Sequence, residues 1–260
     1  MIVISLQSGS NGNCIYIETQ STRLLIDAGI SARQATTRLA ATGRDIRAVD
    51  ALLVTHDHSD HTRSMGTYHR KFDIPVVVTQ KTLAAICSRS KQGRLSNIQP
   101  FVSGESFQMG ELAVESIRTP HDSVDGVAFV LDDGVSRIGI FTDLGHIFTG
   151  LSEVLATLDA VVIESNYDPQ MLEDGLYPEH LKQRIRGPGG HLSNKESADL
   201  LSQVDKSRLQ WACLAHLSEK NNCPEIALNT HRELLGDQFP LYVASRYQQS
   251  ECMKVESAAV

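Results

Sequence analysis

A seven-residue segment, Thr-His-Asp-His-Ser-Asp-His (Thr55–His61), concentrates side chains that bind metal ions. Neutral imidazole and carboxylate groups are the usual protein ligands for zinc and manganese. On extended backbone, residues two apart point to the same side, so His56 and His58 can bind one ion. A turn after them lets Asp60 and His61 face a second ion. The spacing therefore predicts half of a two-metal site.

Partners for this histidine loop stand near the ends of other predicted strands. His121, Asp143 and His216 follow apolar, β-branched runs at 112–118, 137–142 and 209–215. Asp27, His56 and Glu164 occupy the same kind of position, at or just beyond the C-terminal end of a predicted strand. Loops at such ends can bring side chains together over one sheet edge. We therefore expect these segments to complete a single site.

The elements that must position these residues alternate along the chain. The pattern predicts strands at 2–6, 14–18, 23–27, 51–55, 75–78, 112–118, 127–132, 137–142, 160–164, 209–215 and 241–244. It predicts helices at 31–42, from 79 to about 88, and at 151–158, 193–204 and 224–235. Two rounds of strands with helices favour two sheets packed face to face with helices outside, although a doubly wound single sheet also fits. Residues 1–250 are expected to form one domain and 251–260 a flexible tail.

Bulk composition excludes several classes of protein. A chain of 260 residues with 41% hydrophobic residues can bury a large core without structural metals or disulfides. Five cysteines, an odd number without a CxxC pair, argue against a disulfide framework and for a reducing compartment. No basic leader followed by an apolar run opens the chain, and no apolar run approaches the ~20 residues of a membrane span. The expected location is the cytoplasm.

Charge is unevenly distributed. The chain carries a net charge of −7, but residues 180–220 hold a surplus of Lys and Arg. A local basic surface on an acidic protein can bind phosphates, whereas the alternative is an ordinary solvated helix face.

Five ordered features resemble the metallo-β-lactamase family over nearly the whole chain: Asp27 in Leu-Ile-Asp-Ala-Gly, the His-x-His-x-Asp-His loop, a lone histidine, an aspartate after a strand and a final histidine. The resemblance implies an αββα sandwich with a dinuclear site at one edge. It assigns His56, His58 and His121 to one ion, and Asp60, His61 and His216 to the other. Asp143 would bridge both ions, and Asp27 would orient the histidine loop. The implied cofactors are two divalent ions, Zn or Mn, with Fe also compatible.

Ligands of this kind predict a hydrolase and little about its substrate. Two ions that share a water lower its pKa to about 7, and the hydroxide can attack lactams, lactones, thioesters or phosphodiesters. Nucleic-acid-cleaving members of the fold, notably tRNA 3′-processing endonucleases, use a histidine and a supporting glutamate at places that match His191 and Glu164. His191 would act as general acid, with Glu164 and Asp60 as the other catalytic residues. Otherwise His191 is an ordinary loop residue, and Glu164 a helix cap or surface acid.

One subgroup, the YycJ/WalJ-like proteins, is similar in several further segments: 8–14, 164–168, 177–185, 190–194 and 216–222. That resemblance implies a 5′-to-3′ DNA exonuclease in replication or repair, with DNA as the favoured partner. It makes Lys182, Arg184, Lys220 and Asn222 candidate phosphate contacts, although Lys182 and Arg184 also fit an exposed helix face. The alternatives are a small-molecule hydrolase of a lactone, thioester or cyclic phosphodiester, and a non-catalytic binding protein.

Overall fold

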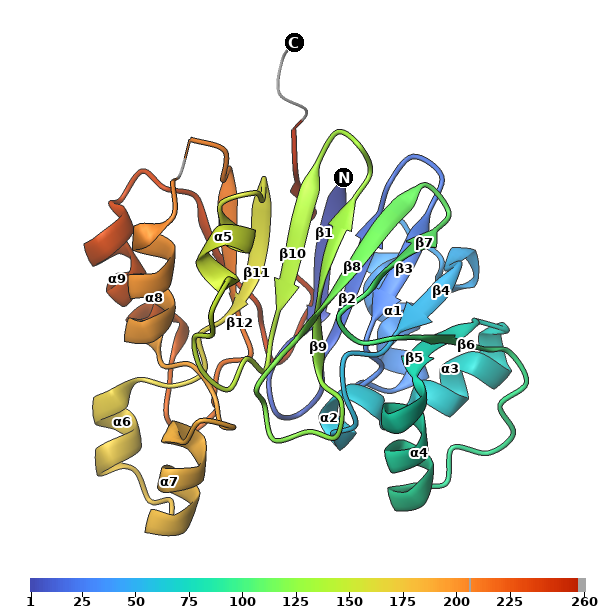
Figure 1. The fold of residues 1–260 in the computed structure, drawn as a ribbon, viewed down its shortest axis with the longest axis horizontal. Coiled ribbons are helices and arrows are strands. Elements are labelled where there is room, and N and C mark those ends of the chain that lie inside the picture. Colours follow the sequence, from blue (N-terminus) through green and yellow to red (C-terminus); the bar gives the residue numbers. More distant parts are fainter. Residues whose placement is uncertain (206, 257–260) are drawn as a thin grey trace.

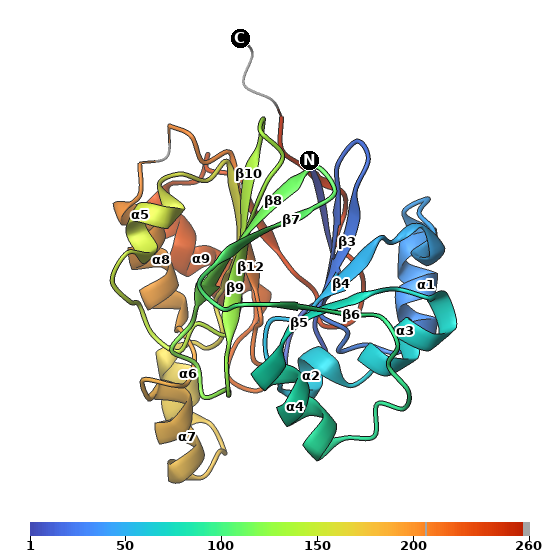
Figure 2. The same ribbon diagram turned by 45° about the vertical axis from the view of Figure 1, so that its right-hand side comes forward.

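Two seven-stranded sheets pack face to face, and helices cover the outer face of each (Figures 1 and 2). The computed structural model describes residues 1–205 and 207–256. The first sheet has the order β14-β1-β2-β3-β4-β5-β6, and the second has the order β13-β12-β11-β10-β9-β8-β7. The chain therefore completes six strands of the first sheet, builds the second, and returns with its last strand to the first. The αββα sandwich predicted from the sequence is confirmed.

The first sheet and its helices contain β1 (Ile2–Gln7), β2 (Cys14–Glu18), β3 (Arg23–Ile26), α1 (Ala32–Ala41), the 3-10 helix η1 (Ile46–Ala48), β4 (Ala51–Leu53), α2 (Ser59–Thr62), α3 (Met65–Phe72), β5 (Val76–Thr79), α4 (Gln80–Arg89), β6 (Ile98–Phe101) and β14 (Met253–Lys254). The second contains β7 (Ser106–Met109), β8 (Leu112–Arg118), β9 (Val127–Asp132), β10 (Arg137–Phe141), α5 (Leu151–Leu155), β11 (Ala160–Glu164), α6 (Pro169–Asp174), α7 (Glu179–Arg186), α8 (Asn194–Gln203), β12 (Trp211–Ala215), α9 (Pro224–Leu235) and β13 (Leu241–Val243).

Three apolar layers hold the sandwich together. In β3, Leu24 and Ile26 face the core between the sheets, whereas Leu25 faces the helices, as the two-residue repeat of a strand requires. In the second sheet, Val162 faces the central core and Val161 faces the outer layer. Strands buried on both faces read as continuous apolar runs, which is why the sequence marks them clearly.

The strand directions bring the predicted site residues to one edge. β3 and β4 are parallel, as are β10, β11 and β12. β8 and β10 both pair antiparallel with β9, so β8 also ends at that edge. In Figure 1 this is the lower edge of the sandwich, where α2, α6 and α7 lie, opposite the two chain termini.

Backbone conformations at this edge are unusual. Among the described residues, the non-glycine residues with positive φ are Asp27 (65°), Asp73 (57°), Asp143 (56°) and His216 (58°). Three of these four are predicted site residues, each within two residues of the end of a strand. Left-handed backbone costs an L-residue roughly 1–2 kcal/mol, so the surrounding structure must hold these three turns in place.

Close packing explains a glycine beside the site. A Cβ on Gly29 would lie 1.6 Å from the carbonyl oxygen of Asp60. Ala28 next to it donates its N–H to the His61 carbonyl at 2.6 Å. The Asp-Ala-Gly turn after β3 can therefore lie directly against the histidine loop only without a side chain at this position.

The structure differs from the predicted elements in several places, and α2, α3, α6 and α7 are among the elements that the predicted set lacks. β6 and β7 were not expected. Within the expected flexible tail, Met253 is 1% exposed and pairs with Val3 through β14. Residues 257–260 lie outside the described residues. In the part of the chain that the structure describes, no helix is long and apolar enough to span a membrane.

Candidate metal centre

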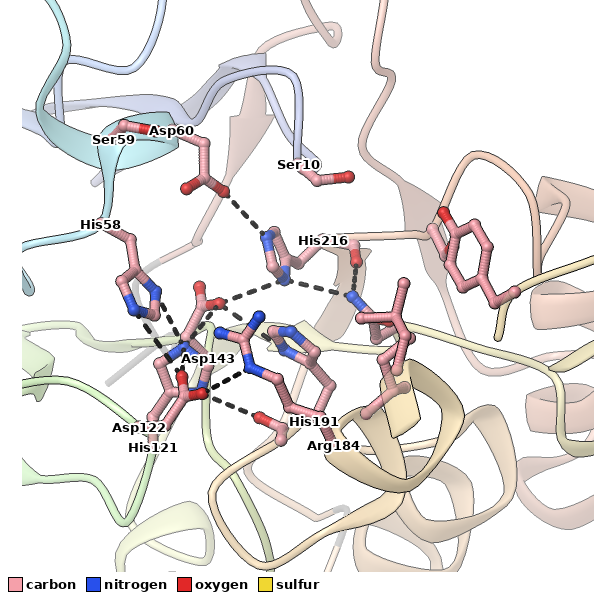
Figure 3. Close-up of a pocket in the computed structure, with 16 residues that line it drawn as sticks. Ser10, His58, Ser59, Asp60, His121, Asp122, Asp143, Arg184, His191 and His216 are labelled. Atoms are coloured by element: carbon pink, nitrogen blue, oxygen red, sulfur yellow. Dashed lines mark hydrogen bonds and ion pairs between the residues drawn. The ribbon is translucent and has the colours of Figure 1, made fainter. Parts of the chain in front are cut away.

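Two sets of ligand atoms converge at this edge, as Figure 3 shows for most of their side chains. In each set the candidate ligand atoms lie within 4.8 Å of one another. The first set is His56, His58 and His121, and the second is Asp60, His61 and His216. Asp143 joins His56 and His61 in a further group, so it lies where both sets can reach it. These are the same groupings that the family resemblance implies.

Unsatisfied buried nitrogens test whether the residues fit a metal. The Nε2 atoms of His56 and His216 are buried and have no hydrogen-bond partner among the described residues. Each ring uses its other nitrogen: His56 Nδ1 lies 3.0 Å from Thr55 Oγ1, and His216 Nδ1 lies 3.2 Å from Glu164 Oε1. A buried polar atom without a partner is costly unless something else coordinates it. The donor set therefore fits divalent cations bound by nitrogen and oxygen.

Electrostatics favour positive charge between these ligands. Burial and the neighbouring His61 hold the pKa of His56 well below its usual range, so its imidazole is neutral. Burial alone would raise the pKa of Asp60, but His61 and His216 bring it to about 2. Burial likewise opposes protonation of His61, yet Asp143 and Asp27 raise its pKa well above the usual value. The buried carboxylates thus stabilise a cation, which a bound divalent ion would supply.

Asp27 is bonded to the histidine loop through both carboxylate oxygens. Its Oδ1 accepts the Thr55 N–H at 2.9 Å, and its Oδ2 accepts the Thr55 hydroxyl at 2.8 Å. Oδ2 also lies 2.7 Å from His61 Nδ1. A carboxylate on Nδ1 fixes the tautomer of the ring and leaves Nε2 for a metal.

Asp57, inside the same loop, was not recognised from the sequence. Its fully buried carboxylate accepts the Val124 N–H at 2.9 Å and is bonded to Arg89 of α4. Val124 lies in the loop that carries His121, so Asp57 fixes the two loops of the first ligand set relative to each other. The alternation that puts His56 and His58 on one side of the loop puts Asp57 on the other, where it supports the loop and does not face the ligand sets.

Glu164 organises the ligands of the second sheet. This fully buried carboxylate accepts the N–H groups of Leu144 at 3.0 Å and Leu192 at 3.1 Å. Its other oxygen lies 2.7 Å from His191 Nδ1 and 3.2 Å from His216 Nδ1. Burial would raise the pKa of Glu164, but the facing His191 and His216 lower it to about 2, so the carboxylate is ionised.

His191 lies between the two ligand sets. Its ring centroid is 5.0 Å from that of His121 and 5.1 Å from that of His216. Nδ1 is held by Glu164, and no hydrogen bond within the described residues uses Nε2. The free nitrogen belongs to a side chain that is 21% exposed and lines the pocket. His191 and Glu164 are therefore in direct contact.

A pocket of about 320 Å³ opens over these residues. One wall is formed by α7 and the loop before it, through Tyr177, Leu181 and Arg184. Arg184 Nε donates to Asp122 Oδ2 at 2.7 Å, and Asp122 Oδ1 lies 3.6 Å from His58 Nε2. The Arg184 side chain is 61% exposed, so its guanidinium stands at the rim of the pocket beside the first ligand set.

Two of the four candidate phosphate contacts, Lys182 and Asn222, bond to other groups of the protein. Lys182 is 8% exposed and donates to the Glu173 carbonyl, which ties α7 to α6. The Asn222 side chain donates from Nδ2 to the carbonyl oxygens of Ser165 and Asn166 and to Asn194 Oδ1. Neither residue lines the pocket. The helix face and the loop direction that decide this cannot be read from the sequence. Lys220 is exposed and also outside the pocket lining.

Two asparagines at the site were missed by sequence reasoning. Asn13 Nδ2 lies 2.9 Å from His61 Nε2 and 3.4 Å from Asp60 Oδ2. Asn166 Nδ2 donates to the His216 carbonyl at 2.7 Å and supports that left-handed turn. Both stand in segments that resemble the YycJ/WalJ-like proteins, and that position is the one signal that points to them.

Comparison with known proteins places the chain in a family. Residues 22–212 match the beta-lactamase superfamily domain, and the chain belongs to that family. It is 34% identical to the exodeoxyribonuclease WalJ of Streptococcus pneumoniae, over 85% of this chain and 83% of that protein. It is 32% identical to the exodeoxyribonuclease YycJ of Bacillus anthracis, over 90% and 88%. The fold matches that of Zn²⁺-bound PqqB from Methylobacterium extorquens, with a TM-score of 0.73, 16% identity and 96% and 100% of the two chains covered. The protein is a metal-dependent hydrolase.

Proposed function

We propose that this hydrolase is a dinuclear phosphodiesterase that acts on nucleic acid, as a 5′-to-3′ DNA exonuclease in replication or repair. The observation that carries the proposal is His191, held by Glu164 between the two ligand sets with Nε2 free. A thiolate leaves with less need for protonation than an alkoxide, so a positioned acid favours a substrate with an alkoxide leaving group, such as a phosphodiester, over a thioester. The names of the relatives that match most of the chain, both exodeoxyribonucleases, support the same substrate.

His56, His58 and His121 are proposed to hold one ion, and Asp60, His61 and His216 the other, with Asp143 shared between them. When bound, two divalent ions supply an activated water and neutralise charge on the phosphate oxygens. Zn, Mn and Fe all suit ligands of this kind. The ionised Asp60, whose side chain is 18% exposed at the pocket, is placed to orient the attacking water.

Proton transfer to the leaving oxygen is the proposed task of His191. Glu164 accepts a hydrogen bond at Nδ1 and so fixes the ring with Nε2 available to the alkoxide. Arg184 at the rim is placed to contact a substrate phosphate, with Asp122 holding its guanidinium until the phosphate arrives. Because Lys182 is bonded to Glu173, we assign phosphate binding at the pocket to Arg184 and the ions. A small number of basic contacts is consistent with the net charge of −7.

An activity assay tests the proposal. The protein is stripped of metal, reconstituted with Mn or Zn, and given 5′-phosphorylated duplex DNA, single-stranded DNA, small phosphodiesters and esters. We expect mononucleotides to appear from the 5′ end, with loss in His58→Ala and retention in His180→Ala, a matched change at an exposed residue outside the pocket. Fast hydrolysis of esters or lactones without DNA cleavage would instead establish the small-molecule hydrolase.

The general-acid role has its own test. His191→Ala is compared with His180→Ala on an ordinary dinucleotide and on a phosphodiester with a p-nitrophenolate leaving group. We expect a loss of about 10²–10⁴-fold on the dinucleotide and a much smaller loss on the activated ester, because a good leaving group needs little protonation. Equal losses on both substrates would remove His191 from this role.

A further inference from the structure

A second cavity lies beside the metal-site pocket. Ser218, two residues after His216, lines both. The second cavity has a volume of about 380 Å³, within the range of small-ligand sites. It lies between the loop after β12 and the loop after β13, at the edge of the sandwich that carries the metal ligands. The two cavities are therefore neighbours at the same edge of the sandwich.

The lining of this cavity is chiefly apolar and includes an exposed aromatic ring. Leu217, Pro224 and Val243 contribute apolar surface, and Tyr247 is 69% exposed. A tyrosine exposed to this extent beside a concave apolar surface is available for stacking. Bases of single-stranded nucleic acid stack on such rings, which tolerate any sequence because every base has a π-face.

Tyr247 is held at both ends. Its hydroxyl donates to Glu219 Oε1 at 3.3 Å, and its backbone carbonyl accepts from Arg38 Nη2 at 2.6 Å. Its N–H also donates to Ser245 Oγ at 3.1 Å. A ring restrained in this way loses little conformational freedom on binding, so more of the stacking energy remains as affinity.

Arg246 joins the two cavities. Its Nη1 donates to the Leu217 carbonyl at 2.9 Å and lies 3.5 Å from Ser10 Oγ, and Ser10 lines the metal-site pocket. The side chain is only 11% exposed, and Glu219 lies 3.7 Å from Nη2 as its carboxylate neighbour. Arg246 thus holds the loop after β12 and the loop after β13 together between the two cavities, with its charge paired by Glu219.

We infer that the second cavity is a nucleobase subsite, in which a base next to the cleaved phosphodiester stacks on Tyr247. This inference rests on the proposed nuclease function and adds to it how the strand is held. It explains how a protein with few basic residues at its pocket can bind a nucleic-acid end, because stacking supplies part of the affinity that phosphate contacts do not.

Kinetics on matched substrates test the subsite. We expect Tyr247→Ala to raise KM on an oligonucleotide about tenfold, and Tyr247→Phe to keep the wild-type KM, because the ring remains. Val135→Ala, at an exposed residue outside both cavities, is the control. On a p-nitrophenyl phosphodiester, which has no base, all four proteins should have the same kcat/KM, and this also excludes misfolding of Tyr247→Ala.

An abasic substrate gives the sharper result. One base at a time is removed on either side of the scissile phosphate. At one position, removal of the base should raise the KM of the wild type by about the factor by which Tyr247→Ala raises it on intact DNA. The same removal should not raise the KM of Tyr247→Ala further. The subsite is wrong, although the protein is a nuclease, if Tyr247→Ala cleaves DNA with the wild-type KM. It is also wrong if the effects of the substitution and of base removal on KM multiply at every position. If the wild type cleaves no DNA, the proposed function itself fails, and the subsite fails with it.

Discussion

The two sheets contribute to the candidate metal centre in different ways. The first sheet supplies His56, His58, Asp60 and His61 from one continuous loop after β4. The second supplies His121, Asp143, His191 and His216 from separate loops after different elements. Each half nevertheless has a buried carboxylate at its centre, Asp27 in the first and Glu164 in the second.

The two carboxylates show what this difference requires. Asp27 fixes a loop whose ligands are already neighbours in the chain, through bonds to Thr55 and His61. Glu164 must bring together groups far apart in the sequence, and it contacts three separate segments through Leu144, His191 and His216. In the first sheet, spacing along the chain is sufficient to bring the candidate ligands together. In the second sheet, this depends on Glu164 as a shared hydrogen-bond acceptor.

Asp143 is the residue that both proposed ligand sets share, and its loss should have the largest effect. Asp143→Ala should reduce kcat/KM by more than about a thousandfold and lower the metal content of the purified protein, because residues that act as a unit fail together. Activity assays and elemental analysis measure the two effects. Asp73→Ala, at an exposed left-handed position outside the site, is the control. Full activity in Asp143→Ala would contradict a shared ligand.

The helix layer on the second sheet contains a pH-sensitive residue. Burial lowers the pKa of His231 in α9 to about 4, against 6.5 in the unfolded chain, while its Nδ1 lies 2.8 Å from the Ala227 carbonyl. Since the unfolded state takes up the proton first, this residue's contribution to stability falls as pH drops from about 6.5 to 4, by about 3 kcal/mol in all. Denaturant titrations of wild type and His231→Gln should show stabilities that converge on acidification. A constant difference across that range would contradict the assignment.

Asp27→Asn and Glu164→Gln compare the two organising carboxylates directly. Each should cost about 10–100-fold in metal affinity or activity, as removal of a partner behind metal ligands usually does. Only Glu164→Gln should change the preference between ordinary and activated leaving groups, because only Glu164 holds His191. If Asp27→Asn changed that preference equally, the two halves would not have separate roles.

Arg184→Met should have the smallest effect. Loss of one exposed phosphate contact should raise KM on DNA a few-fold and weaken its salt dependence, with little change in kcat. Arg186→Met provides the control, because Arg186 is on the same helix but bonded to Glu173, outside the pocket lining. Steady-state kinetics at two salt concentrations separate the outcomes, and equal effects of the two substitutions would contradict a specific role for Arg184.

What the sequence could predict follows the same division. The strands buried on both faces and the histidine loop carry dense local patterns, and both were found. β6 contains Pro100 and is largely exposed, and β14 has two residues, so neither has the apolar run of a central strand. Lys182 shows the corresponding limit at the site: its residue type suited phosphate, but only the packing of α7 against α6 shows where its ammonium group lies.

The left-handed turns at Asp27, Asp143 and His216 have a consequence for how this enzyme can change by mutation. Glycine adopts such backbone without the steric cost that other residues bear. At these three positions, therefore, selection for a stable backbone favours glycine, whereas selection for chemistry favours the side chain that is present. A library screened for melting temperature alone would tend to gather inactive variants at the strand ends, and an activity screen is needed to keep them out.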